Sequence, residues 1–560
     1  MAVVFYGKPD LKSFSFLIFA LTSITVAYCQ YLKLIQFYYT EMKKEKIVGM
    51  IALTVLVGLM GISCKKKEVI KKPNIVYILA DDLGYGDVSI YNSASKIKTP
   101  HIDKLASEGM RFSDAHSPSS VCTPTRYGIL TGRYCWRSRL PEGVLRGYGK
   151  ALLDRERTTT ASFLKENGYT TGIVGKWHLG LDWVVKEEFK DSINHKTTST
   201  NEYGMVTQMN GDWVDFTKKP TDGPLNHGFD YSYILPASLD MEPYCYLEND
   251  VLTELPNEHT PGNDLDTGSY ATGAFWRPGR VTKSFDFYDV LPDFICHGKK
   301  FVETHANDEA PFFLYLPLAA PHSPWVPKPN YDGSSGAGQY GDFVQMVDNQ
   351  VGDFLKSLED TCISDNTIVI FTSDNGPFWK PDFIERFDHK AASIYRGMKA
   401  DAYEGGHRIP FIVRWPGKIE AGSKSNFKTT LTNLMATCAE VLAVTLDEHA
   451  AEDSQSILPI LLSDKNNIEK EIPIVHHSSR GHFAIREGDW KLIEKRGSGG
   501  FSTPATYKPK PGEPVGQLYN LKEDPSEKMN VYADYPEITQ KLKGILEEIK
   551  KEGRSRKYVE

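Results

Sequence analysis

Continuous apolar runs of strand length recur along the chain. They lie at residues 74–80, 169–174, 312–317, 367–372 and 411–415. Runs in which polar residues do not alternate with apolar ones are typical of strands buried on both faces. Patterns of helical period lie between these runs, as at residues 159–166 and 343–358. This alternation predicts a large α/β domain with a mostly parallel central sheet flanked by helices.

The pattern changes in two places. Residues 182–283 are rich in Gly, Asn and Asp and predict an irregular insertion that shapes a cleft. After a predicted helix at 430–444, short strand patterns occupy residues 472–476, 482–486, 490–494 and 517–521, and a helical pattern occupies 536–551. We therefore expect the large domain at 73–455 and a smaller C-terminal α+β subdomain with an antiparallel sheet at 456–560.

The N-terminal extension, residues 1–72, carries two apolar runs. The first, at 14–28, is short for a membrane span. The second follows the charged residues 43–46, occupies 47–60 and ends shortly before Cys64, which is typical of a bacterial lipoprotein signal. The pattern predicts translation from Met42, a signal at 42–63, a lipidated Cys64 and a charged tether. We expect an exported cell-envelope lipoprotein, in the periplasm or at the outer-membrane surface; the alternative is that the whole segment is a membrane anchor.

Composition narrows the possible partners. The chain has 560 residues, 41% of them apolar and 24% charged, as expected for a globular protein. Its formal charge of -7 gives no indication of nucleic-acid binding, and we expect no such partner. The eight cysteines have no spacing typical of a disulfide framework, and two of them, Cys29 and Cys64, lie in the N-terminal extension.

Polar residues follow two of the predicted strands directly. Asp81 and Asp82 come after the first strand, and Asp374 and Asn375 come after the strand at 367–372. Sites in open α/β sheets form beyond the carboxyl ends of the strands, so we expect these four side chains to lie together. Carboxylate and amide oxygens suit Ca²⁺ or Mg²⁺, whereas zinc would favour His or Cys.

Cys122 lies in the segment Cys-Thr-Pro-Thr-Arg at 122–126. Pro124 suits the first turn of a helix, where its missing N–H costs nothing. Cys122 would then face a helix N-terminus, where free N–H groups and the helix dipole favour an anion. Arg126, one turn later, can bind an oxyanion or hold the nucleophile. The segment alone leaves open a buried structural cysteine.

Together these motifs resemble the type I sulfatases of the alkaline phosphatase superfamily. The resemblance rests on Cys-x-Pro-x-Arg at 122–126 with Thr-Gly-Arg at 131–133, Gly-Lys-Trp-His-Leu-Gly at 175–180, Ala-Pro-His-Ser-Pro at 320–324 and Gly-Met-Lys at 397–399. Residues 484–493 and 518–525 resemble the family's C-terminal subdomain. Position 125 holds Thr where the family motif most often has Ser.

The resemblance implies a fold, a cofactor and a set of site residues. The expected fold is alkaline-phosphatase-like. A sulfatase-maturation enzyme would oxidise Cys122 to formylglycine. A divalent metal, usually Ca²⁺ and less often Mg²⁺, would be bound by Asp81, Asp82, the modified Cys122, Asp374 and Asn375. The catalytic residues would be Cys122, Arg126, Lys176, His178, His322 and Lys399, and the substrate would contact Lys176, His322, Lys399 and Asp240.

The implied activity is hydrolysis of sulfate esters, on a sulfated polysaccharide or its oligosaccharides. Hydrated formylglycine would be the nucleophile, with Asp374 as its base, His322 and Lys399 protonating the leaving oxygen, and His178 taking the last proton. One alternative is a phosphonate monoester or phosphodiester hydrolase of the same superfamily. Another is a sulfated-glycan binding protein without catalysis. Further candidates for the substrate cleft are His227, Tyr244, His476, His477 and His482.

Overall fold

The computed structural model describes residues 30–34, 36, 71–192, 209–263, 273, 275–463 and 472–557. The chain divides into two compact units, Met1–Lys71 and Lys72–Glu560. In the first unit, residues 30–34 and 36 are helical and exposed. The predicted signal at 42–63 and the predicted lipidation site Cys64 lie outside the described residues. No helix in the described ranges is both long and apolar enough to cross a membrane.

A ten-stranded mixed sheet forms the centre of the second unit. In spatial order its strands are β13 (Ser423–Ser425), β2 (Met110–Phe112), β12 (Phe411–Arg414), β11 (Thr367–Ser373), β1 (Asn74–Ala80), β10 (Phe312–Pro317), β4 (Thr170–Lys176), β5 (Tyr231–Leu235), β6 (Leu247–Glu248) and β7 (Val251–Leu252). The five central strands, β11 to β5, are parallel. Antiparallel strands flank them on both sides, with β12 pairing against β11 and β6 against β5.

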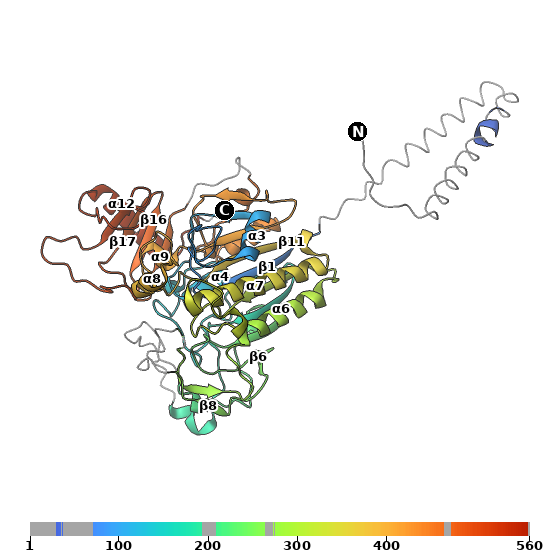
Figure 1. Cartoon of the computed structure of the whole chain (residues 1–560), viewed down its shortest axis with the longest axis horizontal. Helices are drawn as coiled ribbons and strands as arrows, with labels where there is room; N and C mark the ends of the chain where they lie inside the picture. The colour runs from blue at the N-terminus through green and yellow to red at the C-terminus, as the bar shows by residue number, and fades with distance from the viewer. Residues whose placement is uncertain are drawn as a thin grey trace. The chain divides into compact units, whose positions relative to one another are not determined.

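Helices cover both faces of this sheet. The successive residues of β1 alternate between two apolar cores, with Ile75, Tyr77 and Leu79 in one and Val76 and Ile78 in the other. The first core packs under α4 (Cys122–Thr131), α5 (Thr160–Glu166) and α10 (Leu434–Val441), and the second under α3 (Pro100–Glu108), α6 (Val290–His305) and α7 (Gly338–Asp360). Helices α6 and α7 lie side by side along that second face (Figure 1).

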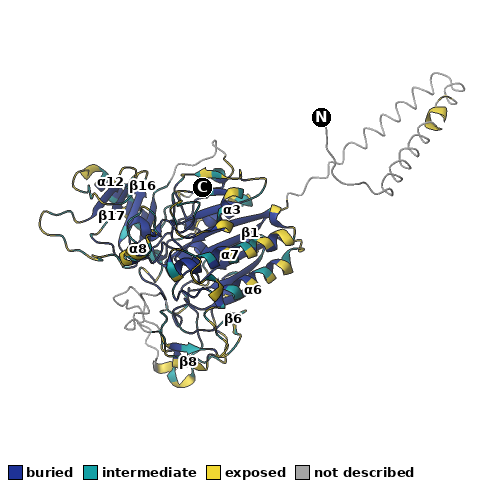
Figure 2. Cartoon of the chain, in the orientation of Figure 1, coloured by how far each residue is buried: buried dark blue, intermediate teal, exposed yellow. Residues whose placement is uncertain are grey.

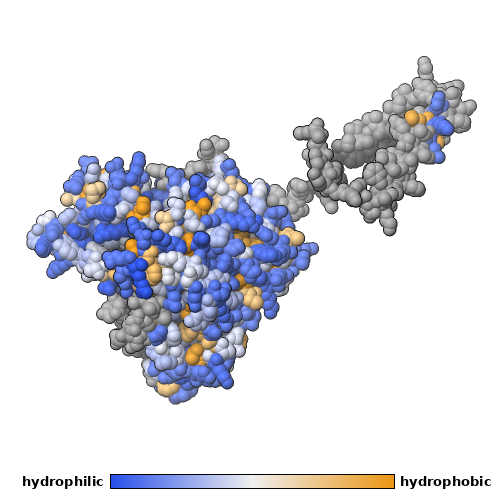
Figure 3. Space-filling model, viewed as in Figure 1, coloured by the Kyte–Doolittle hydropathy of each residue, from blue (hydrophilic) through white to orange (hydrophobic). Residues whose placement is uncertain are grey.

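Burial follows the same layers. The central strands are buried, and the helices expose only their outer sides (Figure 2). The face of the molecule in Figure 3 is mostly hydrophilic, with small separate apolar areas, as expected for a protein surface in water. The prediction of a large α/β domain with a mostly parallel central sheet is therefore confirmed.

Two predicted elements differ from the structure. The insertion at 182–283 is not wholly irregular, because Tyr231–Leu235 forms β5, the fifth parallel strand, with Lys176 opposite Leu235. The insertion also holds a two-stranded ribbon of β8 (Glu258–Thr260) and β9 (Gly279–Val281). The helix expected at 430–444 is shorter, a 3-10 turn at Leu431–Asn433 followed by α10.

The C-terminal part forms a separate antiparallel sheet, as predicted. Its strands are β15 (Ile474–His477), β16 (Phe483–Glu487), β17 (Trp490–Ile493) and β18 (Gln517–Asn520). Helix α12 (Pro536–Glu552) packs Leu542 and Leu546 against Ile485 and Leu492 of this sheet. The sheet belongs to the same compact unit as the large domain.

A buried polar cluster joins the C-terminal sheet to the large domain. His116 Nδ1 lies 3.0 Å from His407 Nδ1, and Lys491 Nζ lies 3.0 Å from His407 Nε2 and 3.1 Å from Glu404 Oε1. The His476 ring stacks on His407 at 3.7 Å between centroids. Neither ring nitrogen of His476 has a hydrogen-bond partner within the described ranges. Burial lowers the pKa of His116 to about 4 and holds the pKa values of His407 and His476 well below their usual range.

The charges of this cluster are already matched. Three cations face Glu404, because Lys491 and Arg408 bind its carboxylate and Arg486 lies 3.7 Å from it. The same three cations also pair with two further carboxylates, those of Asp114 and Glu527, so three cations meet three anions. The cluster therefore has no excess negative charge to attract a metal ion, although His116, Glu404 and His407 are close enough to share one. Ion pairs and neutral imidazoles connect the two sheets.

We predict that acid weakens this junction and that His476→Phe reduces the effect. A histidine whose pKa is lowered by folding binds fewer protons in the folded chain, so its contribution to stability is lost as pH falls below about 6.5 toward the folded-state pKa. Between pH 7 and pH 5 the free energy of unfolding in urea should fall less in His476→Phe than in the unsubstituted protein. The exposed His259→Phe is the control. Equal losses in all three proteins would contradict this account.

Candidate active site

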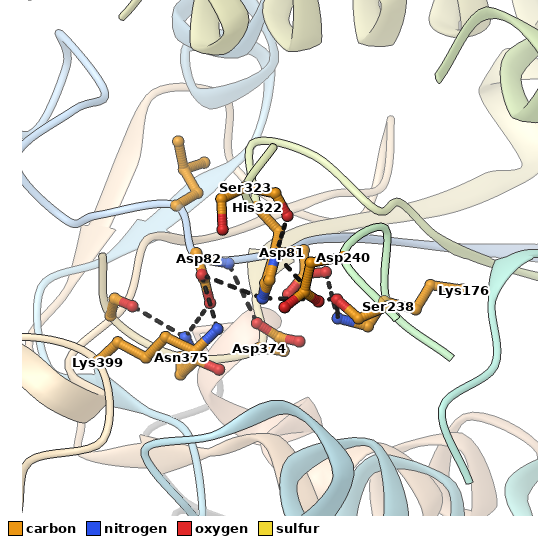
Figure 4. A network of polar contacts seen from close by, with 12 residues as sticks. Asp81, Asp82, Lys176, Ser238, Asp240, His322, Ser323, Asp374, Asn375 and Lys399 are labelled. Carbon is orange, nitrogen blue, oxygen red and sulfur yellow. Dashed lines mark hydrogen bonds and ion pairs between the residues drawn. The ribbon is translucent and has the colours of Figure 1, made fainter. Parts of the chain in front are cut away.

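Each of the five parallel strands carries polar residues at or beyond its carboxyl end. From β11 to β5 they are Asp374 and Asn375, then Asp81 and Asp82, then His322, then Lys176 and His178, then Ser238 and Asp240. Matched register places them together, since Ala80 lies opposite Ser373 and Lys176 lies opposite Leu235. Most of these side chains point toward one another in Figure 4.

Helix α4 brings Cys122 to this group. The helix begins at Cys122, and its next residue, Thr123, donates a hydrogen bond from Oγ1 to the His178 carbonyl at 3.0 Å. Cys122 Sγ and one carboxylate oxygen each of Asp81 and Asp374 lie within 4.8 Å of one another. The helix N-terminus therefore presents the cysteine to the carboxylates at the sheet edge.

Arg126, one turn after Cys122 in α4, connects this helix to the sheet. Its guanidinium is completely buried and donates from Nε and Nη2 to Asp374 Oδ2 at 3.1 and 2.8 Å. Nη1 donates to the Lys176 carbonyl at 2.9 Å. The first two bonds orient Asp374, and all three leave Arg126 little freedom to move.

Two buried lysines neutralise the paired aspartates. Lys176 Nζ lies 2.5 Å from Asp81 Oδ2 and 3.1 Å from Ser238 Oγ, and Lys399 Nζ lies 2.7 Å from Asp82 Oδ2. The strand end that carries Lys176 requires glycine at position 175, where φ is +139° and a Cβ would lie 1.9 Å from the Pro317 carbonyl oxygen. With Arg126, three buried cations therefore face three buried carboxylates.

The carboxylates still hold more negative charge than this environment favours. Burial, and next the Asp81 carboxylate, raises the pKa of Asp374 to about 7. Asp81 keeps a pKa below its usual range because Lys176 and other cations outweigh the effect of burial. Asp81 Oδ1 and Asn375 Oδ1 are buried without a hydrogen-bond partner among the described residues. Orphaned oxygens beside aspartates suit a hard divalent cation, so the residues fit a metal held by Asp81, Asp82, Asp374 and Asn375.

The two histidines each have one nitrogen available. His322 Nδ1 donates to the Ser323 carbonyl at 2.5 Å, and its Nε2 lies 3.5 Å from Ser238 Oγ and 3.7 Å from Asp82 Oδ2. His178 Nε2 donates to the Leu145 carbonyl at 2.8 Å, while its Nδ1 has no partner within the described residues. Burial is the main cause that lowers the pKa of both rings, aided by nearby lysines. Both rings are therefore neutral near pH 7 without substrate.

Cys122 is not a reactive thiolate as encoded. Burial raises the pKa of its thiol, and the nearby Lys176 and Lys399 do not offset this effect. Because the thiolate is the nucleophilic form of cysteine, the unmodified side chain is poorly suited to attack an ester.

A cavity of about 580 Å³ opens over Cys122, His322 and Lys399. Asp240 lies on its wall and pairs with Arg277, which lowers the pKa of the Asp240 carboxyl despite its burial. Sequence reasoning missed both Arg277 and Ser238. Ser238 lies two residues before Asp240 and could have been inferred from the strand end, whereas Arg277 had no local signal.

The structure brings together all the predicted metal and catalytic residues of the second unit. Of the predicted substrate contacts, His322, Lys399 and Asp240 line the cavity, whereas Lys176 lies behind its wall. The five further candidates for the substrate cleft do not line the cavity. His227 Nε2 lies 2.8 Å from Asp222, and the Tyr244 hydroxyl donates to the Arg277 carbonyl. His476, His477 and His482 are buried in the C-terminal sheet and its adjoining turn.

A buried network supports the loop that holds Asp82, whose φ of 66° lies in the left-handed region. Asp87 accepts hydrogen bonds from the Gly84 N–H at 2.6 Å and the Tyr340 hydroxyl at 2.5 Å, and lies 2.7 Å from His389 Nε2. The Tyr340 hydroxyl also lies 3.2 Å from the Asp82 carbonyl. The only sequence signal for this support is the Gly-Tyr-Gly-Asp run that follows Asp82.

Comparison with known proteins decides the family. A family model described as Sulfatase matches residues 73–444. The chain belongs to the sulfatase family. A second model, described as N-sulphoglucosamine sulphohydrolase, C-terminal, matches residues 398–552. The predictions of a type I sulfatase and of a sulfuric ester hydrolase are thereby confirmed. Sulfatases generally use formylglycine and a divalent metal.

Relatives of this sulfatase include proteins from bacteria and animals. An N-acetylgalactosamine-6-O-sulfatase of Bacteroides thetaiotaomicron is 36% identical over 516 residues, covering 86% of this chain and 93% of that protein. Human arylsulfatase A is 30% identical over 492 residues, covering 85% and 87% of the two chains. A solved structure from work on the metabolism of multiple glycosaminoglycans by Bacteroides thetaiotaomicron has a TM-score of 0.73 and 34% identity, covering 86% of this chain and 100% of that one.

We predict that a divalent cation stabilises the folded sulfatase through Asp81. A cation that binds only the folded state raises stability by about 2.7 kcal/mol at a concentration 100 times its Kd. Asp81→Asn should weaken the cation-induced rise in Tm, with a Kd at least about tenfold higher, because one buried anionic ligand is lost. Asp230→Asn, far from the strand-end group, is the matched control. An Asp81→Asn protein with an unchanged rise would place the cation elsewhere.

Proposed function

We propose that this sulfatase is an exported, formylglycine-dependent enzyme that removes 6-O-sulfate from N-acetylgalactosamine residues of sulfated glycosaminoglycans or their oligosaccharides. The observation that carries the reaction is Cys122 at the start of α4, within 4.8 Å of oxygens of Asp81 and Asp374. The choice of sugar is supported by the relative with 36% identity, which is an N-acetylgalactosamine-6-O-sulfatase.

Two groups added to the encoded chain would supply the reactivity. A maturation enzyme would convert Cys122 to formylglycine, whose hydrate offers a nucleophilic hydroxyl in place of the protonated thiol. Asp81, Asp82, Asp374 and Asn375 would hold Ca²⁺, which would supply Lewis-acid chemistry toward the sulfate. A ligand set made of protein oxygens favours Ca²⁺ over Mg²⁺, which usually retains several waters. The rise in Tm described above should then be larger with Ca²⁺ than with Mg²⁺.

The residues of the chain neutralise the sulfate and accept the first proton. Lys176 and Lys399 are buried ammonium groups beside Asp81 and Asp82 and would bind the sulfate oxygens as charge develops. Asp374, oriented by its two bonds from Arg126, accepts the proton of the attacking hydroxyl. Its carboxylate belongs to the same compact group as Cys122 Sγ.

The histidines complete the proton transfers. His322 lines the cavity and directs Nε2 toward Asp82 and Ser238. The negative charge of a bound sulfate ester favours the protonated form of His322. This imidazolium then donates its proton to the departing sugar oxygen. His178 Nδ1, which has no partner among the described residues, takes the proton of the remaining hydroxyl as sulfate leaves. One difficult hydrolysis is thereby divided into two easier steps.

Maturation of Cys122 can be measured directly. In a host that matures sulfatases, the peptide containing residue 122 should be about 18 Da lighter than its cysteine form. The mass falls because formylglycine, whose hydrate is the nucleophile, carries an aldehyde in place of the thiol. Cys122→Ala should lose turnover of N-acetylgalactosamine 6-sulfate and of aryl sulfate, yet keep its Tm. Cys296→Ala, an exposed cysteine on α6, is the control.

Two outcomes would count against this function. A fully active Cys122→Ala enzyme would remove the nucleophile from the proposal. A matured enzyme that hydrolyses aryl phosphodiesters faster than aryl sulfates would favour the phosphodiester hydrolase of the same superfamily.

We also propose that residues 42–63 direct export and that Cys64 carries the lipid anchor. The support is the basic and apolar pattern that ends at this cysteine. In a bacterial host, labelled palmitate should enter the full chain and Cys29→Ala but not Cys64→Ala. A chain beginning at Lys71 should be water-soluble and active, because the compact unit begins at Lys72. Labelling that persists in Cys64→Ala would show that another residue carries the lipid.

A further inference from the structure

Two arginines line the cavity that opens over Cys122, in addition to the residues assigned to the sulfate. Arg146 lies between α4 and α5, and Arg480 lies in the turn between β15 and β16. Both side chains are half-buried. Neither guanidinium has a hydrogen bond or an ion pair within the described part of the chain. They differ in this respect from Lys399 and Arg277, which lie in the same cavity and bind Asp82 and Asp240.

An unpaired, partly desolvated guanidinium is unfavourable in a free protein. Burial removes water from the charge, and an ion pair normally compensates for that loss. At Arg146, burial and then Arg277 lower the pKa of the guanidinium, and the nearby Asp240 and Glu242 offset this effect only in part. Among the described residues, the two guanidinium charges on the cavity wall are therefore not paired with any carboxylate, which is the property expected of a site for an anionic ligand.

Backbone hydrogen bonds hold both arginines in fixed positions relative to the nucleophile. On the Arg146 side, the Leu145 N–H donates to Thr123 Oγ1 at 3.2 Å, and Thr123 directly follows Cys122. On the Arg480 side, the Ser479 N–H donates to the Ala400 carbonyl at 3.0 Å, and Ala400 directly follows Lys399.

The two sides are also bound to each other. The Gly143 N–H donates to the Ser479 carbonyl at 3.0 Å, and the Arg480 N–H donates to the Gly499 carbonyl at 3.1 Å. Both positions are therefore formed before any ligand binds, which limits the entropy lost on binding. The C-terminal subdomain completes the wall of the cleft with a charged residue of its own.

We propose that Arg146 and Arg480 bind anionic groups of the substrate other than the sulfate that is hydrolysed, namely carboxylates or further sulfates on the neighbouring sugars. This inference rests on the proposed function, because it extends the same cleft to more of the glycan. A guanidinium forms forked, charge-assisted hydrogen bonds with carboxylate and sulfate oxygens alike. The enzyme is accordingly selective for polyanionic oligosaccharides over sugars that carry one sulfate.

The test compares substrates that share one scissile sulfate. They are N-acetylgalactosamine 6-sulfate, the disaccharide that links it to a hexuronate, the methyl ester of that hexuronate, and the methyl ester with a second sulfate on the hexuronate. The matured enzyme should hydrolyse both dianionic disaccharides with kcat/KM at least about tenfold above the monosaccharide, mainly through a lower KM. The methyl ester alone should lose this advantage. The second and fourth substrates separate carboxylate recognition from sulfate recognition.

The variants identify the residues. Arg146→Ala and Arg480→Ala should each reduce the ratio of dianionic to monoanionic kcat/KM about threefold or more, and the double variant should bring it close to one. Arg→Lys at either position should restore part of the ratio, because charge remains but the fork is lost. Arg386→Ala, exposed on α8 (Pro381–Phe387), is the control and should keep the ratio.

The outcomes that overturn the inference are separate from failure of the proposed function. An unchanged ratio in either single variant removes that arginine from the subsite. If the matured enzyme hydrolyses none of these esters, the proposed function fails. Calorimetric binding of the same four sugars to Cys122→Ala still tests the subsite, because it requires no turnover. Equal Kd values for monoanionic and dianionic sugars would overturn the inference, and a Kd ratio lost in Arg146→Ala and Arg480→Ala would support it.

Discussion

The burial of three neighbouring carboxylates is the constraint on which the site depends. Asp81, Asp82 and Asp374 come together because their strands run parallel in matched register. Unmatched like charges inside a protein are strongly unfavourable, so the fold must supply compensating charge at the same place. Lys176, Lys399 and Arg126 do so, from β4, from the loop after Gly397 and from α4. These contacts hold the sheet edge, the helix and the loop in one arrangement.

The compensation remains incomplete, and that is the chemical use of the site. Asp81 Oδ1 and Asn375 Oδ1 lack partners among the described residues, and the pKa of Asp374 is raised to about 7. A site that satisfied every group internally would leave nothing for a cation or a sulfate to bind. These unsatisfied atoms lower the stability of the fold. Burial of the central strands in two apolar cores compensates for that loss.

The C-terminal subdomain contributes to both stability and the cleft. Its sheet is joined to the large domain through buried ion pairs of Glu404 and through the stacked rings of His407 and His476. The turn that follows β15 then reaches the cavity and places Arg480 on its wall. A change that loosens the junction is therefore expected to alter substrate binding as well as stability.

Sequence by itself indicated four of the five parallel strands, the resemblance to the family and most of the site. Long apolar runs require burial on both faces, and the parallel-strand rule then assigns Asp81, Asp82, Asp374 and Asn375 to one edge of the sheet. The local segment Cys-Thr-Pro-Thr-Arg at 122–126 identified Cys122 and Arg126.

Only the tertiary structure decided which distant charges meet. Strand β5 was missed because its five residues include a serine and lie within an irregular segment, and Ser238 was missed with it. The pairing of Arg277 with Asp240 and the convergence of Arg146 and Arg480 on one cavity have no local pattern. The physical reason is that local periodicity reports which face of an element is buried, whereas contacts between loops depend on how whole elements pack.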